Sequence, residues 1–195
     1  RAVSLDFKAP GDLLYVLGET RAELGGSEFY RWYGEQERGR AYVGNAVPRV
    51  EAESALRRYR ALHQAMREGR VRSCHTPALG GLAVALARAA FAGRLGAELD
   101  LGKVPQGARS AGQVGAEPRS DTELLYSESN SRFLVSVAPQ VAPAFEGLFA
   151  GQPCACVGRV LKEPVLRVRG IAGAPLLERA LGPLLSEWKG TSADG

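Results

Sequence analysis

Several residue types are scarce in this 195-residue sequence, and each scarcity excludes a class of protein. Three cysteines and two histidines are too few for a disulfide framework, and no familiar zinc spacing can be built from them. The longest apolar stretch runs from Pro77 to Ala87 and stops at Arg88, well short of the roughly 20 residues that a bilayer span requires. We therefore expect no disulfide, no metal site of this kind and no membrane segment.

The few cysteines and the N-terminus both point to a reducing compartment. Cys154 and Cys156 project to the same side of a predicted strand, and we expect them to be buried free thiols. The N-terminus lacks the basic-then-apolar layout of a secretory signal, which favours the cytoplasm. The sequence begins at Arg1 and its one methionine is Met66, so we expect a fragment or an excised domain.

The charge is mildly positive, because 21 arginines and 4 lysines face 21 acidic residues. Most arginines are scattered. One denser group contains Arg57, Arg58, Arg60, Arg67, Arg70 and Arg72. Aromatic residues do not interleave with this group in the manner of a single-strand nucleic-acid platform, so we interpret it as a solvated helix face and expect no nucleic-acid partner.

A hydrophobic content of 45% is enough to bury a core, and the pattern predicts one domain over residues 1–188 with a frayed tail at 189–195. Apolar runs predict strands at 12–18, 71–75, 96–101, 132–137, 154–160 and 165–169. Helical patterns cover 48–70, 82–93, 141–149 and 175–188, and an exposed loop is expected at about 102–121.

The order of these elements predicts the architecture. Helices and strands alternate early, and the last two strands should form a hairpin through Lys162, Glu163 and Pro164. The sheet should therefore be mixed, in an α+β fold with three α/β/α layers. In the helix at 48–70, the spacing of Leu56, Tyr59, Leu62 and Met66 predicts a core-facing stripe.

Three segments place small or polar residues where a strand is followed by a loop or helix, which is where backbone N–H groups can face an anion. The first is residues 24–28, in which Gly25 and Gly26 permit close backbone approach and Ser27 could donate a hydrogen bond to a phosphate. An ordinary turn explains these residues equally simply.

The second segment is residues 75–81, where Gly80 and Gly81 open a buried helix and could bind an anion at its end. His75 could act as a general base there. No carboxylate or nucleophile is legible beside it, so a hydrogen-bonded structural histidine is the alternative.

The third segment is residues 127–132, six polar residues immediately before a strand. Glu128, Ser129 and Asn130 lie in its middle, and polar groups at strand ends are where ligands are commonly held. We expect this segment to face either a ligand or an interface.

These segments also carry a family resemblance. GDLLYVLGETRAELGGSEFY, GGLAVALARAAFAGRLGAELDL and YSESNSRFLVSV together resemble the C-terminal module of the aminoimidazole ribonucleotide synthetase superfamily, in its formylglycinamide ribonucleotide amidotransferase branch. The likeness spans nearly the whole chain. The resemblance implies the last of four domains, in which two modules of this kind alternate with two nucleotide-binding modules.

The resemblance further implies an ATP-dependent ligase of purine synthesis. In that family ATP phosphorylates the substrate's amide oxygen, ammonia attacks, and phosphate leaves. Magnesium assists, and a glutaminase supplies the ammonia. By implication the partners are the nucleotide-binding module of the same enzyme and the glutaminase and small subunits. The catalytic histidine and most ATP contacts of the family lie in the nucleotide-binding modules, so no catalytic residue and no bound cofactor are expected on this chain alone.

One motif departs from the family's pattern. Where the family often has a metal-binding Asp, followed by Ser and a second Asp, this sequence has Thr76, Ala78 and Leu79. These side chains cannot hold magnesium as carboxylates do, so we expect no metal at this junction. The resulting hypothesis is an inactive, mainly architectural domain that closes an auxiliary phosphate site.

Two other functions are weighed against this hypothesis. The chain could instead be an interaction module that recruits the glutaminase or small subunit through an uncovered apolar patch. A selenophosphate synthetase or thiamine-phosphate kinase type of protein is the third possibility, and ELGGSE and SESNSR argue against it.

Overall fold

The computed structural model describes residues 2–107 and 120–190, and its core is a seven-stranded sheet in the order β2-β4-β1-β5-β3-β6-β7. The strands are β1 (Leu13–Leu17), β2 (Ser73–His75), β3 (Gly96–Asp100), β4 (Phe133–Val137), β5 (Cys154–Leu161), β6 (Val165–Arg169) and β7 (Pro175–Ala180). β3 and β6 run parallel and the other neighbours antiparallel, so the predicted mixed sheet is confirmed.

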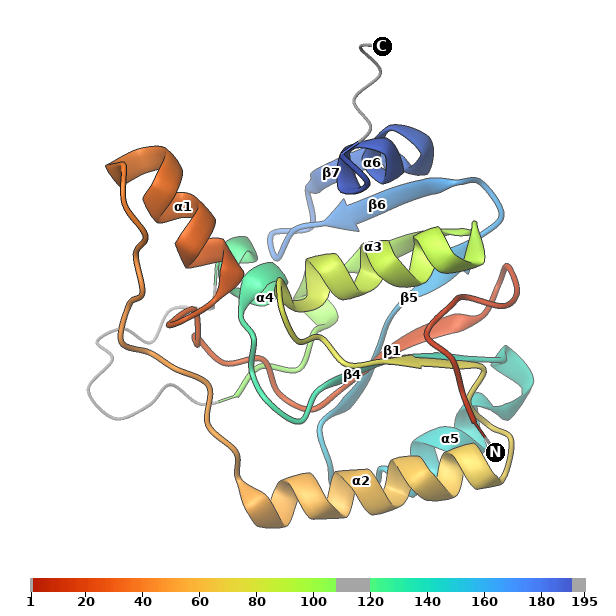
Figure 1. The fold of residues 1–195 in the computed structure, drawn as a ribbon. Coiled ribbons are helices and arrows are strands. Elements are labelled where there is room, and N and C mark those ends of the chain that lie inside the picture. Colours follow the sequence, from red (N-terminus) through yellow and green to blue (C-terminus); the bar gives the residue numbers. More distant parts are fainter. Residues whose placement is uncertain (1, 108–119, 191–195) are drawn as a thin grey trace.

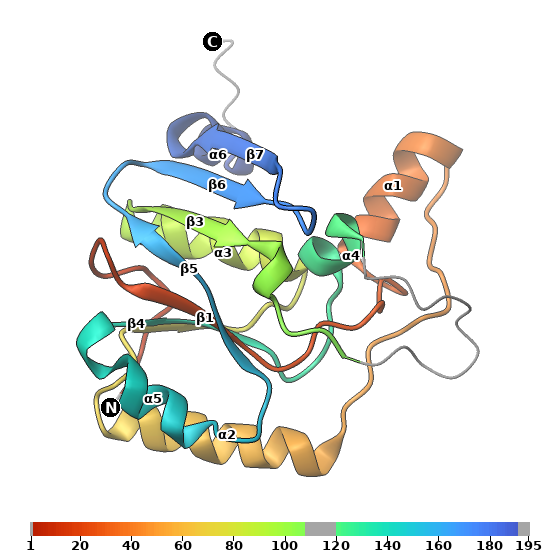
Figure 2. The same ribbon diagram turned by 180° about the vertical axis from the view of Figure 1, so that it is seen from behind.

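Helices cover both faces of this sheet (Figures 1 and 2). α3, α4 and α6 lie on one side, α2 and α5 lie on the other, and α1 extends away from the body. Their bounds are α1 (Glu28–Arg38), α2 (Ala52–Arg67), α3 (Gly81–Gly93), α4 (Asp121–Tyr126), α5 (Ala142–Leu148) and α6 (Leu181–Trp188), with short 3-10 helices at Leu101–Lys103 and Pro139–Val141. The predicted three-layer α+β sandwich is confirmed.

The apolar run of β1 connects the two cores. Leu14 and Val16 point into the cluster beneath α3, whereas Tyr15 and Leu17 point into the cluster beneath α2 and α5. Successive side chains of a strand face opposite sides, so an apolar residue at every position is what a central strand between two helical layers needs. Leu62 of α2 belongs to the second cluster.

The predicted hairpin between β5 and β6 is wrong, because β3 lies between these two strands. The connection at 162–164 instead passes across the first residue of β3. A Cβ atom on Gly96 would lie 2.0 Å from the carbonyl oxygen of Glu163, a distance that no side chain tolerates. Glycine at this position therefore allows the crossing, and sequence spacing alone could not distinguish a crossing from a tight turn.

The buried stripe of α2 also differs from the expectation. Leu56 and Tyr59 are 48% and 43% exposed, while the buried positions are Ala55, Arg58, Ala61, Leu62 and Ala65. Alanines allow the helix to approach the sheet closely, so the small residues occupy the contact and the larger ones lie at its margin.

The predicted C-terminal helix is half wrong. Pro175–Ala180 forms the edge strand β7, paired with β6, and α6 begins only at Leu181. Pro183 lies in the first turn of α6, where proline is well tolerated. Its position in the sequence therefore indicates that the helix begins close to residue 181 and not at Pro175. Residues 108–119 of the expected loop and residues 191–195 of the expected tail lie outside the described residues.

Candidate functional site

The three polar segments meet at one corner of the molecule, and the carboxylate of Glu128 joins them. Its Oε1 accepts hydrogen bonds from the backbone N–H of Gly80 at 2.8 Å and from that of Glu28 at 3.0 Å. Gly80 immediately precedes α3 and Glu28 begins α1, so a single anionic oxygen lies at the start of two helices, where the helix dipole favours negative charge.

Gly80 has the backbone geometry that this contact requires. Its φ is +79°, in the left-handed region, and a Cβ there would lie 2.3 Å from Cγ2 of Val84. Only glycine fits both constraints. The predicted double glycine is therefore explained by the entry of the chain into α3.

A buried arginine fixes the polar loop behind this carboxylate. Arg132 is fully buried, and its guanidinium donates to the carbonyl oxygens of Ser129 (3.1 Å) and Ser127 and to Oγ1 of Thr20 (2.7 Å). Burial lowers its pKa to about 10, while the carboxylates of Glu23 and Glu128 oppose this shift. Each guanidinium nitrogen has an oxygen partner, as a buried charge requires.

The backbone N–H groups expected to bind phosphate are engaged within the chain. Those of Gly25 and Gly26 donate to the carbonyl oxygens of Ala46 (2.8 Å) and Val43 (2.7 Å). The N–H of Ser27 donates to Leu24, and that of Gly81 donates to Ala78. A phosphate role for these residues stays a prediction, and it requires these bonds to be exchanged.

The serine hydroxyls of the corner are buried as well. Ser27 is 2% exposed and caps α1, where its Oγ accepts from the N–H of Tyr30 at 3.2 Å. Ser129 is 3% exposed, and its Oγ accepts from the N–H of Arg21 at 3.0 Å. Asn130 is exposed, so it is the SESNSR residue most available to a ligand.

The junction before α3 does not suit magnesium. Thr76, Ala78 and Leu79 are exposed and offer one hydroxyl and two apolar groups, whereas magnesium prefers carboxylate oxygens. Glu128 lies nearby, but its Oε1 already accepts two N–H groups. In residues 2–107 and 120–190 no three His, Cys, Asp or Glu side chains gather as metal ligands would.

His75 lies on β2 opposite Leu134 of β4, and its ring is half-buried. Burial and the nearby charge of Arg88 lower the pKa of the imidazole. A lowered pKa favours the neutral ring, which is the form that a general base needs. Within residues 2–107 and 120–190 no hydrogen bond joins the His75 ring to the Glu128 carboxylate, and its role as a general base stays a prediction.

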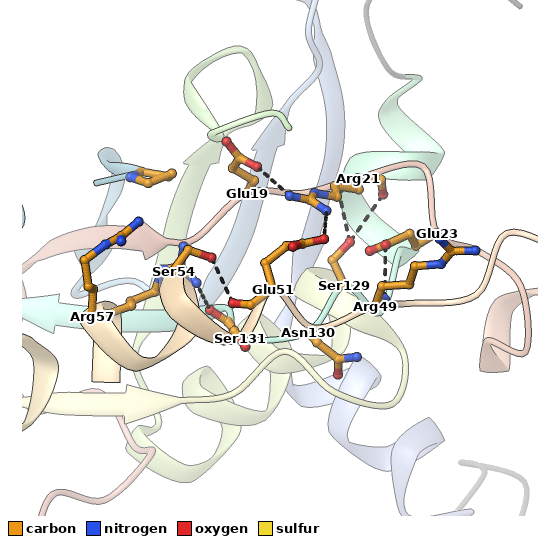
Figure 3. A pocket seen from close by; sticks show the side chains of 12 residues that line it. Glu19, Arg21, Glu23, Arg49, Glu51, Ser54, Arg57, Ser129, Asn130 and Ser131 are labelled. Atoms are coloured by element: carbon orange, nitrogen blue, oxygen red, sulfur yellow. Dashed lines mark hydrogen bonds and ion pairs between the residues drawn. The ribbon is translucent and has the colours of Figure 1, made fainter. Parts of the chain in front are cut away.

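A second candidate site is a pocket of about 300 Å³ between residues 129–131 and the start of α2 (Figure 3). Its lining includes Arg21, Glu51, Arg57, Arg58, Ser129 and Asn130. On one side Arg21 lies between two carboxylates, 3.3 Å from Glu19 and 3.7 Å from Glu51. The sequence predicts a solvated helix face at Arg57 and Arg58 and does not indicate this pocket.

The comparisons with known proteins agree with the fold and with these motifs. Residues 9–171 match the family described as AIR synthase related protein, C-terminal domain. The chain therefore belongs to this family of synthetase-type domains.

A curated relative narrows the likeness within the family. Phosphoribosylformylglycinamidine synthase subunit PurL of Thermococcus sibiricus is 34% identical over 163 residues, which are 84% of this chain. They are only 20% of the relative, so the chain spans about a fifth of its length. The predicted resemblance to the formylglycinamide ribonucleotide amidotransferase branch is thus confirmed.

Solved structures share the fold. PurL of Thermotoga maritima, in a structure described as complexed with FGAR, matches with a TM-score of 0.75 at 22% identity and covers 93% of this chain and 29% of its own. Escherichia coli HypE, a hydrogenase maturation protein, matches with a TM-score of 0.59 at 15% identity, over 91% of this chain and 51% of its own. No helix within 2–107 or 120–190 combines the length and apolarity needed to cross a membrane.

Proposed function

We propose that this chain is the C-terminal domain of an ATP-dependent ligase that converts formylglycinamide ribonucleotide to formylglycinamidine ribonucleotide in purine biosynthesis. In this proposal its role is architectural: it packs against a nucleotide-binding module and does not itself hold ATP or magnesium. The family match and the 34% identical PurL relative support the choice of enzyme. Thermotoga PurL structures described as complexes with ATP, ADP and AMPPCP support ATP as the cosubstrate of the whole enzyme.

The single observation that carries the architectural role is the position of the Glu128 carboxylate. It lies on the N–H groups of Gly80 and Glu28, where a bound phosphate would accept hydrogen bonds at the start of a helix. A fixed anion at this place stabilises the corner and repels a second anion. The corner thus keeps the form of a phosphate site while its own side chain occupies it.

Titration calorimetry of the chain with magnesium-ATP tests this proposal. We expect no heat of saturable binding in the micromolar range, because the N–H groups are engaged and the junction lacks carboxylates for the metal. Micromolar binding by the chain would overturn the architectural role.

A second candidate function, recruitment of the glutaminase or small subunit, is favoured by the surface of α1. This helix stands away from the body (Figures 1 and 2), and it exposes 57% of Trp32 and 36% of Tyr33. Both rings lie 6.1 Å from the ring of Phe29. Exposed, contiguous aromatic rings are typical of protein interfaces.

Binding assays with the purified glutaminase and small subunits distinguish the two candidates. Recruitment predicts that Trp32→Ala weakens capture of these subunits. Trp188→Ala is the matched control, because Trp188 is also 57% exposed but lies on α6. Capture of the nucleotide-binding module alone, with no capture of either subunit, would reject recruitment.

A further inference from the structure

The pocket beside α2 contains a buried cation that lacks an ion-pair partner. Arg58 is only 6% exposed. Its NH1 donates to the carbonyl oxygen of Ser131 at 2.9 Å, but its Nε–H is buried with no hydrogen-bond partner. In the described part of the chain no carboxylate lies within 4.0 Å of it. Buried charges are normally paired, so this guanidinium is incompletely satisfied.

The other buried arginine shows what a satisfied site looks like. Every nitrogen of the Arg132 guanidinium has an oxygen partner within the chain. Both arginines donate to carbonyl oxygens of residues 127–131, and they differ in that Arg58 lines an open pocket and Arg132 does not. Because Arg58 lines the pocket, an anion held there would lie beside this guanidinium.

Four arginines and three glutamates line the pocket, so the charged side chains of its lining carry a net charge of +1. Arg57, its neighbour on α2, also lines the pocket and has no ion-pair partner among the described residues. The carboxylates of Glu19 and Glu51 form ion pairs with Arg21, and the charge of Glu19 also acts on Arg58. The third lining carboxylate, Glu23, accepts a hydrogen bond from the backbone N–H of Arg49 at 3.3 Å. The pocket also lies at the N-terminal end of the 16-residue helix α2, whose Glu51 N-cap makes no side-chain capping bond. The partial positive charge of that helix end adds to the two guanidinium charges.

We propose that this pocket binds the phosphate or carboxylate group of a small molecule, with Arg57 and Arg58 as its cationic groups and Asn130 as a neutral donor. Guanidinium groups bind such planar or tetrahedral oxyanions through paired N–H donors. A volume of about 300 Å³ lies at the lower end of the range for ligand sites, so the ligand is smaller than a nucleoside triphosphate. The site's cationic groups, Arg57 and Arg58, do not belong to the Glu128 corner, and the site does not depend on the proposed ligase reaction.

Titration of the chain at constant ionic strength tests the proposal. The probes are inorganic phosphate, ribose 5-phosphate and succinate, followed by the NMR resonances of arginine Nε–H groups and by thermal unfolding. We expect saturable binding with a dissociation constant on the order of millimolar, and the probe that binds most tightly identifies the phosphate or the carboxylate as the ligand group. Arg57→Gln should weaken binding about tenfold, because one charged hydrogen bond is lost.

Two further variants keep the test decisive. Arg58→Lys keeps the charge but loses the planar donor pair, and it should weaken binding at least as much as Arg57→Gln. Arg60→Gln is the matched control, since Arg60 is an exposed arginine of the same helix outside the pocket, and it should bind like the unchanged chain. The proposed anion site would be contradicted if no probe bound saturably, or if Arg60→Gln weakened binding as much as Arg57→Gln does. Either result would leave the magnesium-ATP test of the Glu128 corner unaffected.

Discussion

Replacement of Glu128 by alanine should destabilise the domain by about 2–3 kcal/mol. The side chain accepts two backbone N–H groups, at 2.8 and 3.0 Å, and hydrogen bonds to a charged group contribute about 1.5–3 kcal/mol each when buried. Glu128 is half-buried, so water replaces part of this loss. For a domain of this size the change corresponds to a fall in Tm of about 4–12 °C.

Urea denaturation followed by far-UV circular dichroism measures this effect. Glu128→Gln retains a neutral acceptor for both N–H groups and should lose about half as much free energy of unfolding. Glu37→Ala changes an exposed glutamate of α1 and should stay within about 0.5 kcal/mol of the unchanged chain. If Glu128→Ala were as stable as Glu37→Ala, the reasoning that this carboxylate joins the corner would be refuted.

The same variant should also respond to added anions. Removal of the carboxylate leaves the N–H groups of Gly80 and Glu28 without a partner at two helix starts, which are sites that favour anions. Phosphate or sulfate at constant ionic strength should therefore raise the Tm of Glu128→Ala more than that of the unchanged chain. Equal shifts would mean that a free anion cannot replace the side chain.

Two further predictions concern the crossing at β3 and the thiols. Gly96→Ala should prevent stable folding, because the new Cβ would lie 2.0 Å from the carbonyl oxygen of Glu163. The control is Gly147→Ala, because a Cβ at Gly147 meets nothing within 4 Å. In urea denaturation this control should be neutral or stabilising by up to about 1 kcal/mol. Burial raises the pKa of Cys74 and of Cys154 from 9.0 to about 12, so only the unfolded thiols ionise between these values. The contribution of these thiols to the free energy of unfolding should therefore be constant below pH 9 and decrease from pH 9 to 12. Iodoacetamide at pH 8 should modify both thiols far more slowly in the native chain than in the urea-unfolded chain, as measured by mass spectrometry.

Much of the fold could be predicted because the strongest hydrophobic patterns are compatible with only one type of secondary structure. The apolar run of β1 and the single charge in α3 both indicate burial on nearly all sides, and the structure confirms them. The sequence predicts helix in place of the edge strand β7, because a short apolar run such as Pro175–Leu177 fits either the helical or the strand period. The helix α1 has a capping serine at Ser27 and a terminal glycine at Gly39, and these signals could have located it.

Only part of the candidate site could be identified from the sequence, and the reason differs from that for the fold. Sequence motifs identified the segments that meet at the corner, since glycines and polar residues mark strand ends. They could not show that the Glu128 carboxylate already occupies the N–H groups, because its partners lie 48 and 100 residues away. Arg58 was hidden by its neighbours: among exposed arginines on α2, nothing in the sequence marks the one that turns inward.

The central position of β5 has a consequence for synthesis of this domain. β5 is built from residues 154–161, yet it lies between β1 and β3 and is the strand that joins the two halves of the sheet. A nascent chain that has not yet emerged from the ribosome beyond this point exposes two unpaired strand edges, which are prone to association with other chains. Stable folding must therefore wait until nearly the whole domain has been translated, and chaperones that shield open strand edges would matter most during that interval.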